Sequence, residues 1–379
     1  MTAQLTTPPA LVRTGQRRTP DRPRVLVVSG SVGAGHDGAA RELAQRLTAA
    51  GASVDVRDLL AAVPRPVARL LRDGYTNSVS YLPAFFEFLF RRLEHRGLFW
   101  RVEQKVCASA VESVTDWVSR SNPDVIVSTY PLASQTLGEL RADGRLAVPV
   151  MTYLTDPAVH ASWLHPGVDE HLTVTEATAA QGRREYGLPF TVAGPLVPAR
   201  FAQTLGAAGR VALRAELGLD GQRPVALLAA GSLGLGNLVG TVRDVTAAGF
   251  VALVLCGRNE ALRRRVAARP GTVALGWRTD VHSLLQVADV LVQNAGGLSC
   301  TEALVAGLPT VTYRPIPGHG RANAQVMHDA GLAPWARTPA ELAVLLHAQL
   351  AQDRTPPTLG DPATVVLAAV RRSAVEAAA

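Results

Sequence analysis

The feature that most constrains the fold of this chain is a strand, a glycine turn and a helix near its C-terminal end. An apolar strand at residues 290–292 leads into a turn at Gly296 and Gly297. Ser299 stands where a helix N-cap is expected, and Glu302 follows at capping-box spacing. A helix that starts at a strand end offers free N–H groups and a positive dipole end, which suit a phosphate. An ordinary strand-to-helix junction gives the same pattern.

Length and composition predict a globular α/β protein with two domains. A chain of 379 residues exceeds the size of one ordinary core, and 47% apolar with 18% charged residues is typical of a globular protein. No apolar run reaches the roughly 18–20 residues needed for a membrane span. Three cysteines without metal-binding spacing argue against a disulfide framework and indicate a reducing cytoplasm.

The strand–turn–helix pattern occurs in both halves of the chain. An apolar strand at 24–29 opens into a glycine-rich turn at 30–35, and a second such strand at 224–230 opens into the turn 231–236. We therefore predict two facing, Rossmann-like doubly wound domains with a cleft between them. The predicted divisions are a disordered leader at 1–23, an N-terminal domain at 24–195, a linker at 196–209, a C-terminal domain at 210–360 and a C-terminal helix at 361–379.

Two glycine turns in the second half, at 231–236 and 296–297, predict a diphosphate held by backbone amides. Neither turn carries a Walker lysine. A loop further along adds His319, Arg321 and Asn323, which can serve phosphate or sugar hydroxyls or can be ordinary polar loop residues.

His36 is the candidate acid–base group. It follows a tight glycine loop at a helix start, where the dipole lowers its pKa and favours a neutral base. Asp156, just beyond a strand end, can orient or assist it. A histidine at a helix start with no chemical role gives the same pattern. The spacing of His160, His165 and His171 matches no usual zinc motif, so we predict no metal site.

A basic and aromatic segment spans residues 64–101. Phenylalanines such as Phe85 and Phe86 alternate with arginines such as Arg91 and Arg92. Such a segment can lie in a membrane interface, or it can be a helical pair packed on the domain. The net charge of +7 suits phosphate-bearing ligands, anionic lipid surfaces and nucleic acid alike.

Taken together, these motifs resemble those of the monogalactosyldiacylglycerol synthase and processive diacylglycerol glucosyltransferase family. More distantly, the chain resembles the N-acetylglucosaminyltransferase that makes lipid II. The resemblance covers residues 24 to about 334. Its motifs are Gly33-Ala-Gly-His36, Thr155-Asp156 with His160, Trp163 and Asp169, Ala193-Gly-Pro195, Gly276-Trp277, Gly296-Gly297 followed by Glu302, and Pro317-Gly-His319 followed by Asn323.

The resemblance implies a GT-B fold and inverting transfer of a hexose from a UDP-sugar to a lipid acceptor, expected to be diacylglycerol. The N-terminal domain at 24–195 would bind the acceptor, and the C-terminal domain at 210–360 would bind the nucleotide-sugar. His36 or Asp156 would take the proton of the acceptor hydroxyl. Glu302 would bind the ribose, and no cofactor beyond the UDP-sugar donor is expected. The predicted nucleotide-sugar-binding residues are Gly231, Ser232, Gly257, Trp277, Asn294, Gly296, Gly297, Glu302, His319 and Asn323.

The same resemblance implies where the protein acts. The segment 64–101 resembles the family's membrane-facing acceptor helices, so Phe85, Phe86, Arg91 and Arg92 are the predicted acceptor or membrane contacts. The expected partners are a UDP-hexose, a lipid acceptor and an anionic membrane surface, with no nucleic acid. The expected location is cytoplasmic, peripheral to the inner face of the membrane.

One position departs from the family pattern. Members usually carry lysine or arginine just before the glycine turn, where this chain has Asn294. That change can weaken diphosphate binding, change the donor or mark a divergent protein. Two alternative functions are a UDP-sugar-dependent transferase acting on a soluble natural product and a UDP-sugar epimerase of related fold. The third, which Asn294 makes conceivable, is a non-catalytic nucleotide-sugar-binding protein.

Overall fold

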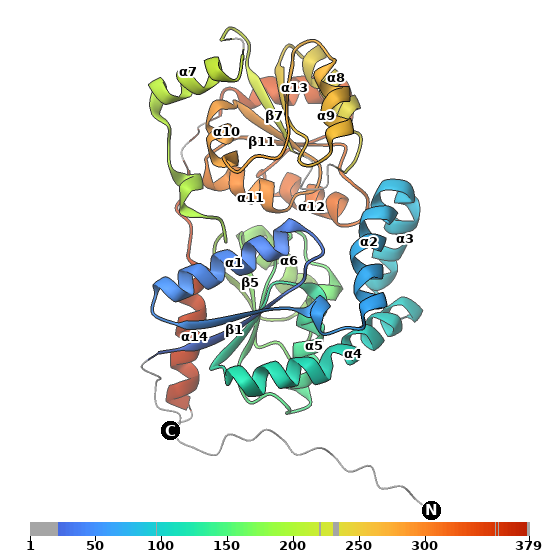
Figure 1. Ribbon diagram of the computed structural model, residues 1–379, viewed down its shortest axis with the longest axis vertical. Coiled ribbons are helices and arrows are strands. Elements are labelled where there is room, and N and C mark those ends of the chain that lie inside the picture. The colour runs from blue at the N-terminus through green and yellow to red at the C-terminus, as the bar shows by residue number, and fades with distance from the viewer. Residues whose placement is uncertain are drawn as a thin grey trace, which may run out of the picture.

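The protein is built on two parallel six-stranded sheets, one in each half of the chain (Figure 1). This computed structural model describes residues 22–376, apart from residues 96, 220, 230–234, 353 and 355. The strand orders are β2-β1-β3-β4-β5-β6 and β12-β11-β10-β7-β8-β9. Every neighbouring pair runs parallel, and helices connect the strands. The prediction of two doubly wound α/β units is confirmed.

The first sheet consists of strands with continuous apolar cores, as expected when helices cover both faces of a sheet. In β1, Leu26 and Val28 belong to the buried cluster on one face, whereas Val25 and Val27 belong to the cluster on the other. The strands of this sheet are β1 (Arg24–Ser29), β2 (Ser53–Asp58), β3 (Val125–Ser128), β4 (Val150–Tyr153), β5 (Glu170–Thr173) and β6 (Phe190–Val192). The helices that follow its strands include α1 (Ala34–Ala49), α5 (Pro131–Ala142) and α6 (Glu176–Tyr186).

The second sheet has its central strand, β7, between β8 and β10. Its strands are β7 (Val225–Ala229), β8 (Val251–Leu255), β9 (Thr272–Leu275), β10 (Val290–Gln293), β11 (Thr310–Tyr313) and β12 (Trp335–Ala336). Its helices are α7 (Gly206–Glu216), α8 (Leu238–Ala247), α9 (Glu260–Ala267), α10 (Val281–Val287), α11 (Leu298–Val305), α12 (His319–Asp329) and α13 (Pro339–Gln349).

The chain crosses back to the first half at its end. Helix α14 (Pro362–Glu376) packs beside α1 and β3, and Figure 1 shows it in red along the lower half. Its Val366 is fully buried in the same cluster as Leu43 of α1. Arg46 of α1 joins both crossing segments, because its guanidinium donates to the carboxylate of Asp361 (3.1 Å) and to the carbonyl of Val197 (2.5 Å).

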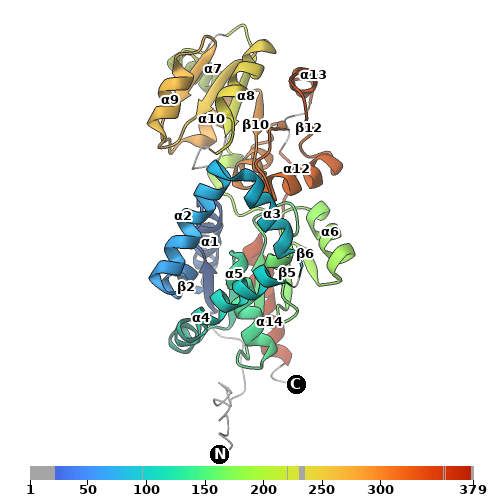
Figure 2. The ribbon, with the colours of Figure 1, turned by 90° about the vertical axis from the view of Figure 1, so that its right-hand side faces the viewer.

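Three consecutive helices of the first half form an arm, and the first two of them reach alongside the second half (Figures 1 and 2). They are α2 (Arg65–Tyr81), α3 (Pro83–Leu93) and α4 (Leu98–Ser121), and α2 and α3 rise toward α12 in Figures 1 and 2. The backbone N–H of Gly318, at the start of α12, donates to the carboxylate of Glu87 in α3 (2.7 Å). This bond fastens the arm to the second half. Among the described helices, none has the length and apolar character required to span a bilayer.

Candidate active site

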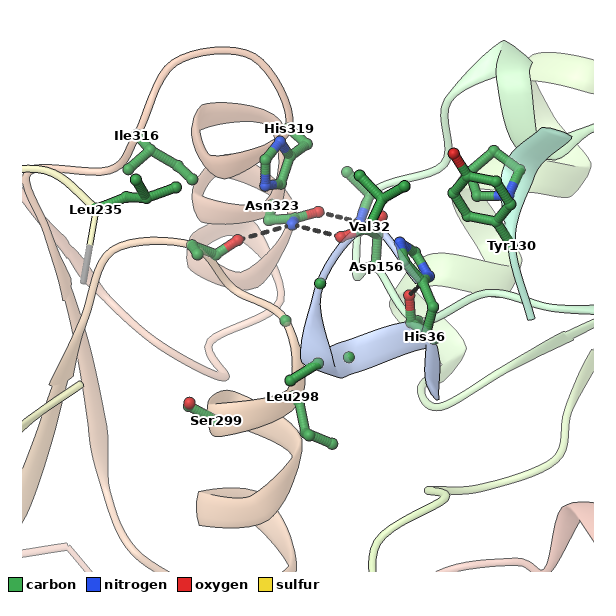
Figure 3. A pocket seen from close by; sticks show the side chains of 18 of the residues that line it. Val32, His36, Tyr130, Asp156, Leu235, Leu298, Ser299, Ile316, His319 and Asn323 are labelled. Carbon is green, nitrogen blue, oxygen red and sulfur yellow. Dashed lines mark hydrogen bonds between the residues drawn. The ribbon is translucent and has the colours of Figure 1, made fainter. Parts of the chain in front are cut away.

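A cavity of about 610 Å³ lies between the two halves and is lined by both. The first half contributes the turn at residues 32–36, the loop after β4, and parts of α3 and α4. The second half contributes the turns after its strands and the first residues of α11 and α12. Carboxyl ends of parallel strands meet on both sides of this space, which is where doubly wound folds bind ligands. Figure 3 shows side chains of both halves pointing into it.

His36 lies in the first turn of α1 and lines the cavity. Its Nδ1 is 2.9 Å from the carbonyl oxygen of Thr129 and 3.3 Å from the hydroxyl of Thr155. A carbonyl only accepts, so Nδ1 carries the hydrogen and Nε2 keeps its lone pair. Burial lowers the pKa of His36, while the charge of Asp156 opposes that shift. His36 is therefore arranged as a neutral base.

Asp156 also lines the cavity, and its two carboxylate oxygens have different partners. One oxygen accepts from Trp163 Nε1 (3.2 Å) and the other from Asn323 Nδ2 (3.1 Å). The Thr129 carbonyl, and not Asp156, accepts from the His36 ring and orients it. Asp156 acts on His36 through its charge alone, so its predicted assistance of the base stays a prediction. Asp156 supplies negative charge near a base that becomes cationic when it takes a proton.

Asn323 connects the two halves across the cavity wall. Its Oδ1 accepts from the N–H of Ala158 (2.9 Å), and its Nδ2 donates to Asp156 and to the carbonyl of Ala295 (2.9 Å). Figure 3 shows its amide directed at Asp156. Both amide hydrogens are used within the protein, so the predicted role as a sugar or phosphate ligand does not fit this arrangement. Asn323 is a fully buried bridge.

The glycine turn before α11 differs from the capping box expected from the sequence. The helix begins at Leu298 with Gly297 as its N-cap and with no side-chain cap, so the N-cap prediction for Ser299 is wrong. The reason is the side chain of Gln293, which accepts the N–H groups of Ala295 (2.8 Å) and Gly296 (2.6 Å). These bonds tighten the turn and start the helix earlier along the chain.

The two glycines of this turn have different roles. The N–H of Gly296 is bound by Gln293, and a Cβ at Gly296 would lie 2.5 Å from Cβ of Asn323. Gly296 therefore permits close packing, and its φ of 79° also favours glycine. Gly297, Leu298 and Ser299 line the cavity. The first N–H groups of a helix have no partner inside it, so the predicted anion site shifts to residues 297–299.

Asn294 does not contribute to the cavity lining. Its Nδ2 donates to the carbonyl of Leu235 (2.7 Å), and its side chain is buried. A Cβ at Gly236 would lie 2.7 Å from the same nitrogen. Asn294 thus braces the segment after β7, which does not fit its predicted role as a nucleotide-sugar ligand.

Other residues predicted to bind the nucleotide-sugar come from the second half, and those that the structure describes line the cavity. Gly257, Trp277 and Glu302 all line it. The guanidinium of Arg258 lies 4.8 Å from the Trp277 ring centroid. Burial raises the pKa of Glu302 to about 7, against the opposing charge of Arg200. Gly231 and Ser232 lie outside the described residues.

His319 faces the first half at the start of α12. The centroid of its ring lies 6.0 Å from that of Phe86 and 6.4 Å from that of Phe90, and burial lowers the pKa of His319.

The four residues predicted to contact the acceptor or the membrane divide into two groups. Phe86 lines the cavity, whereas the outer side of α3 carries Phe85, Arg91 and Arg92, which are exposed.

Sequence reasoning missed Glu103, a buried carboxyl group of α4 that lines the cavity. A signal for it exists in the sequence. Glu103 precedes Cys107, Ala110 and Val114 at helical spacing, and all four are buried. A single acidic residue on an otherwise small and apolar helix face indicates a special environment.

Comparison with known proteins identifies relatives of the chain. The family model for monogalactosyldiacylglycerol (MGDG) synthase matches residues 36–190. The processive diacylglycerol beta-glucosyltransferase of Bacillus cytotoxicus is 24% identical over 352 residues, covering 88% of this chain and 87% of that protein. The enzyme of the same name from Bacillus subtilis is 23% identical over 326 residues, covering 82% of each. The resemblance to this family is confirmed.

Solved structures share the fold. The glycotransferase of kitacinnamycin superposes with a TM-score of 0.59 at 17% identity, covering 95% of this chain and 96% of that one. MurG of Acinetobacter baumannii gives 0.52 at 18% identity, covering 94% of each. UGT89C1 of Arabidopsis thaliana, in complex with UDP, gives 0.58 at 15% identity and covers 94% of this chain and all of that one. The fold is GT-B, as predicted.

We predict that Asn323→Ala loosens the two halves. The change removes three hydrogen bonds and leaves the buried N–H of Ala158 unsatisfied, which costs about 1–3 kcal/mol. The thermal unfolding midpoint should fall and the radius of gyration from small-angle X-ray scattering should rise. Gln325→Ala, an exposed amide on the same helix, is the matched control and should change neither. Equal behaviour of the two variants would show that Asn323 is not a bridge.

Proposed function

We propose that this chain, a glycosyltransferase with the GT-B fold and a relative of the monogalactosyldiacylglycerol synthases, transfers a hexose from a UDP-sugar to diacylglycerol with inversion at the anomeric carbon. The observation that carries the proposal is the pairing of two groups in one cavity. The first half supplies a neutral histidine, His36, and the second half supplies the start of α11. A base opposite an anion site is the arrangement that a direct displacement needs.

The donor is proposed to bind along the second half. Within the described part of the chain, the N–H groups at residues 297–299 have no hydrogen-bond partner, and together with the dipole of α11 they suit a diphosphate. Glu302 lies further along α11, where its carboxyl group is available to ribose hydroxyls. Gly276 and Trp277 provide a backbone edge and an aromatic surface for the base. These positions agree with the roles that the family resemblance implies.

The transfer is proposed to occur in one step. The acceptor hydroxyl oxygen forms a bond to the anomeric carbon as the bond between that carbon and the β-phosphate oxygen breaks. The bonding electron pair leaves with UDP, whose growing charge meets the N–H groups of α11. The hydroxyl proton passes to Nε2 of His36, and the nearby charge of Asp156 stabilises the imidazolium that results. Attack opposite to the leaving group inverts the anomeric centre.

The acceptor is proposed to enter from a membrane. The arm carries exposed apolar side chains together with exposed arginines, which suits an anionic lipid surface. We propose that this surface is the inner, cytoplasmic leaflet. The exposed apolar residues of the arm are Leu70, Leu82, Phe85, Phe88, Leu98 and Val102.

A panel of UDP-sugars tests the proposed reaction directly. Incubation with diacylglycerol in mixed micelles should release UDP and give a hexosyl-diacylglycerol by mass spectrometry, with inverted anomeric configuration by NMR. Turnover of soluble natural products in place of diacylglycerol would contradict the lipid acceptor. UDP binding in calorimetry without release of UDP from any donor would identify a non-catalytic nucleotide-sugar-binding protein.

We predict that His36→Ala reduces kcat by about 10²–10⁴-fold, the share that general-base catalysis contributes. Affinity for UDP should stay the same, because His36 belongs to the other half of the cavity. Burial holds the pKa of His36 below its ordinary value of 6.5, so wild-type kcat should fall only as the pH drops through that lowered pKa, where the imidazole takes up a proton. His95→Ala, an exposed histidine outside the cavity, should keep full turnover. Near-normal turnover of His36→Ala would exclude His36 as the base.

We predict that Phe85→Asp weakens binding to liposomes that contain phosphatidylglycerol. The substitution places a carboxylate on an exposed apolar surface next to anionic lipid, so flotation with the liposomes should decrease. Val344→Asp is the matched control, because Val344 is exposed on α13 of the second half. If both variants float like the wild type, the arm does not contact the membrane.

A further inference from the structure

The arm and the helix beside it contribute leucines to the cavity lining. They are Leu71 of α2, Leu89 and Leu93 of α3, and Leu132 of α5, which packs beside α4. Glu103 of α4 and Ser162 also line the cavity, as does Tyr130, which faces Glu103. The proposed acceptor is itself largely apolar, so a buried carboxyl group beside these leucines calls for an explanation.

Glu103 is only 9% exposed. Within the described part of the chain, its carboxylate has no ion-pair partner. The Ser162 hydroxyl is also buried and lies close to the Glu103 carboxyl group, but it makes no hydrogen bond of ordinary geometry with any described residue. A buried carboxyl group without a cation or a full set of hydrogen bonds is destabilising, so its presence in the wall of a cavity points to a bound ligand.

The surroundings favour the neutral form of Glu103. Burial raises its pKa to about 7, while the Ser162 hydroxyl acts in the opposite direction. The titratable groups that face it are Cys107 on its own helix and Tyr130 beside α5. Burial raises the pKa values of both above the physiological range, so neither carries a charge that would favour a carboxylate. Glu139 of α5 is an acidic group that acts on Cys107.

We propose that Glu103 and Ser162 form a polar anchor in the acceptor pocket, which binds an ester carbonyl oxygen of the lipid while the surrounding leucines hold its acyl chain. A protonated carboxyl group donates one hydrogen bond to a carbonyl oxygen, and a hydroxyl donates another. This inference rests on the proposed lipid acceptor. It places the ester group and the acyl chain of the acceptor, which do not react, beside Glu103 and the leucines.

Acceptor binding is then linked to uptake of a proton. An uncharged lipid that fills the pocket expels water from Glu103, which makes the carboxylate form more costly and the protonated form more stable. Only the protonated form donates to the ester. The dissociation constant of the acceptor should therefore rise by up to tenfold per pH unit once the pH exceeds the pKa of free Glu103.

The test is direct binding of dioctanoylglycerol, a short-chain diacylglycerol, to the full chain by calorimetry between pH 6 and pH 9. Buffers of different ionisation enthalpy report the protons taken up. Wild-type protein should bind with proton uptake at pH 7–8 and more weakly at higher pH. Glu103→Gln keeps an uncharged donor, so it should bind within about threefold of wild type at pH 6, with no proton uptake and no pH dependence.

Glu103→Leu removes the donor but retains apolar volume, so it should weaken binding at pH 6 by about tenfold. UDP affinity and the thermal unfolding midpoint identify any variant that has not folded. Absence of dioctanoylglycerol binding to the wild type, pH-independent binding, or wild-type affinity of Glu103→Leu would each overturn the anchor. Binding with the expected pH dependence but no hexosyl transfer would count against the proposed reaction alone.

Discussion

A single buried amide determines how the two halves of this protein meet. Asn323, on α12 of the second half, donates to Asp156 and accepts from Ala158, both of the first half, while also bonding Ala295 of its own half. Gly296 must lack a side chain for Asn323 to reach this position. The turn that presents α11 and the carboxylate beside His36 are consequently held in register by the same side chain. That contact therefore links the two walls of the cavity.

A second contact joins the halves on the side of the arm. Glu87 of α3 accepts the N–H of Gly318 at the start of α12, and Phe86 and Phe90 pack against His319 one residue later. The arm proposed to meet the membrane therefore touches the element that carries Asn323. Helix α12 makes both contacts, with α3 at its start and with the first half through Asn323. A displacement of α3 would therefore also move residues that line the cavity.

Much of the fold was predictable from the sequence, whereas the detailed roles of several residues were not. Continuous apolar strands followed by glycine turns predicted both sheets, and Trp277, Glu302 and His319 were expected in the cavity that they do line. Ser299 was misassigned because the long side chain of Gln293, and not local spacing, fixes where α11 begins. The bridge through Asn323 joins residues far apart in sequence, which no local pattern encodes. The burial of Glu103 did have a local signal, its helical spacing with Cys107, Ala110 and Val114, but that signal does not show what the carboxyl group faces.

The position of α14 has a consequence for how the protein is made. Val366 and its neighbours complete the apolar cluster around Leu43, so the second sheet is in effect inserted within the first unit. On a ribosome, β1 and α1 emerge early and must wait for the whole second half before the helix that covers them appears. During that interval the face of the first sheet that carries Val25 and Val27 lacks one of the helices that pack on it. Synthesis from the N-terminus therefore finishes the second core before the first.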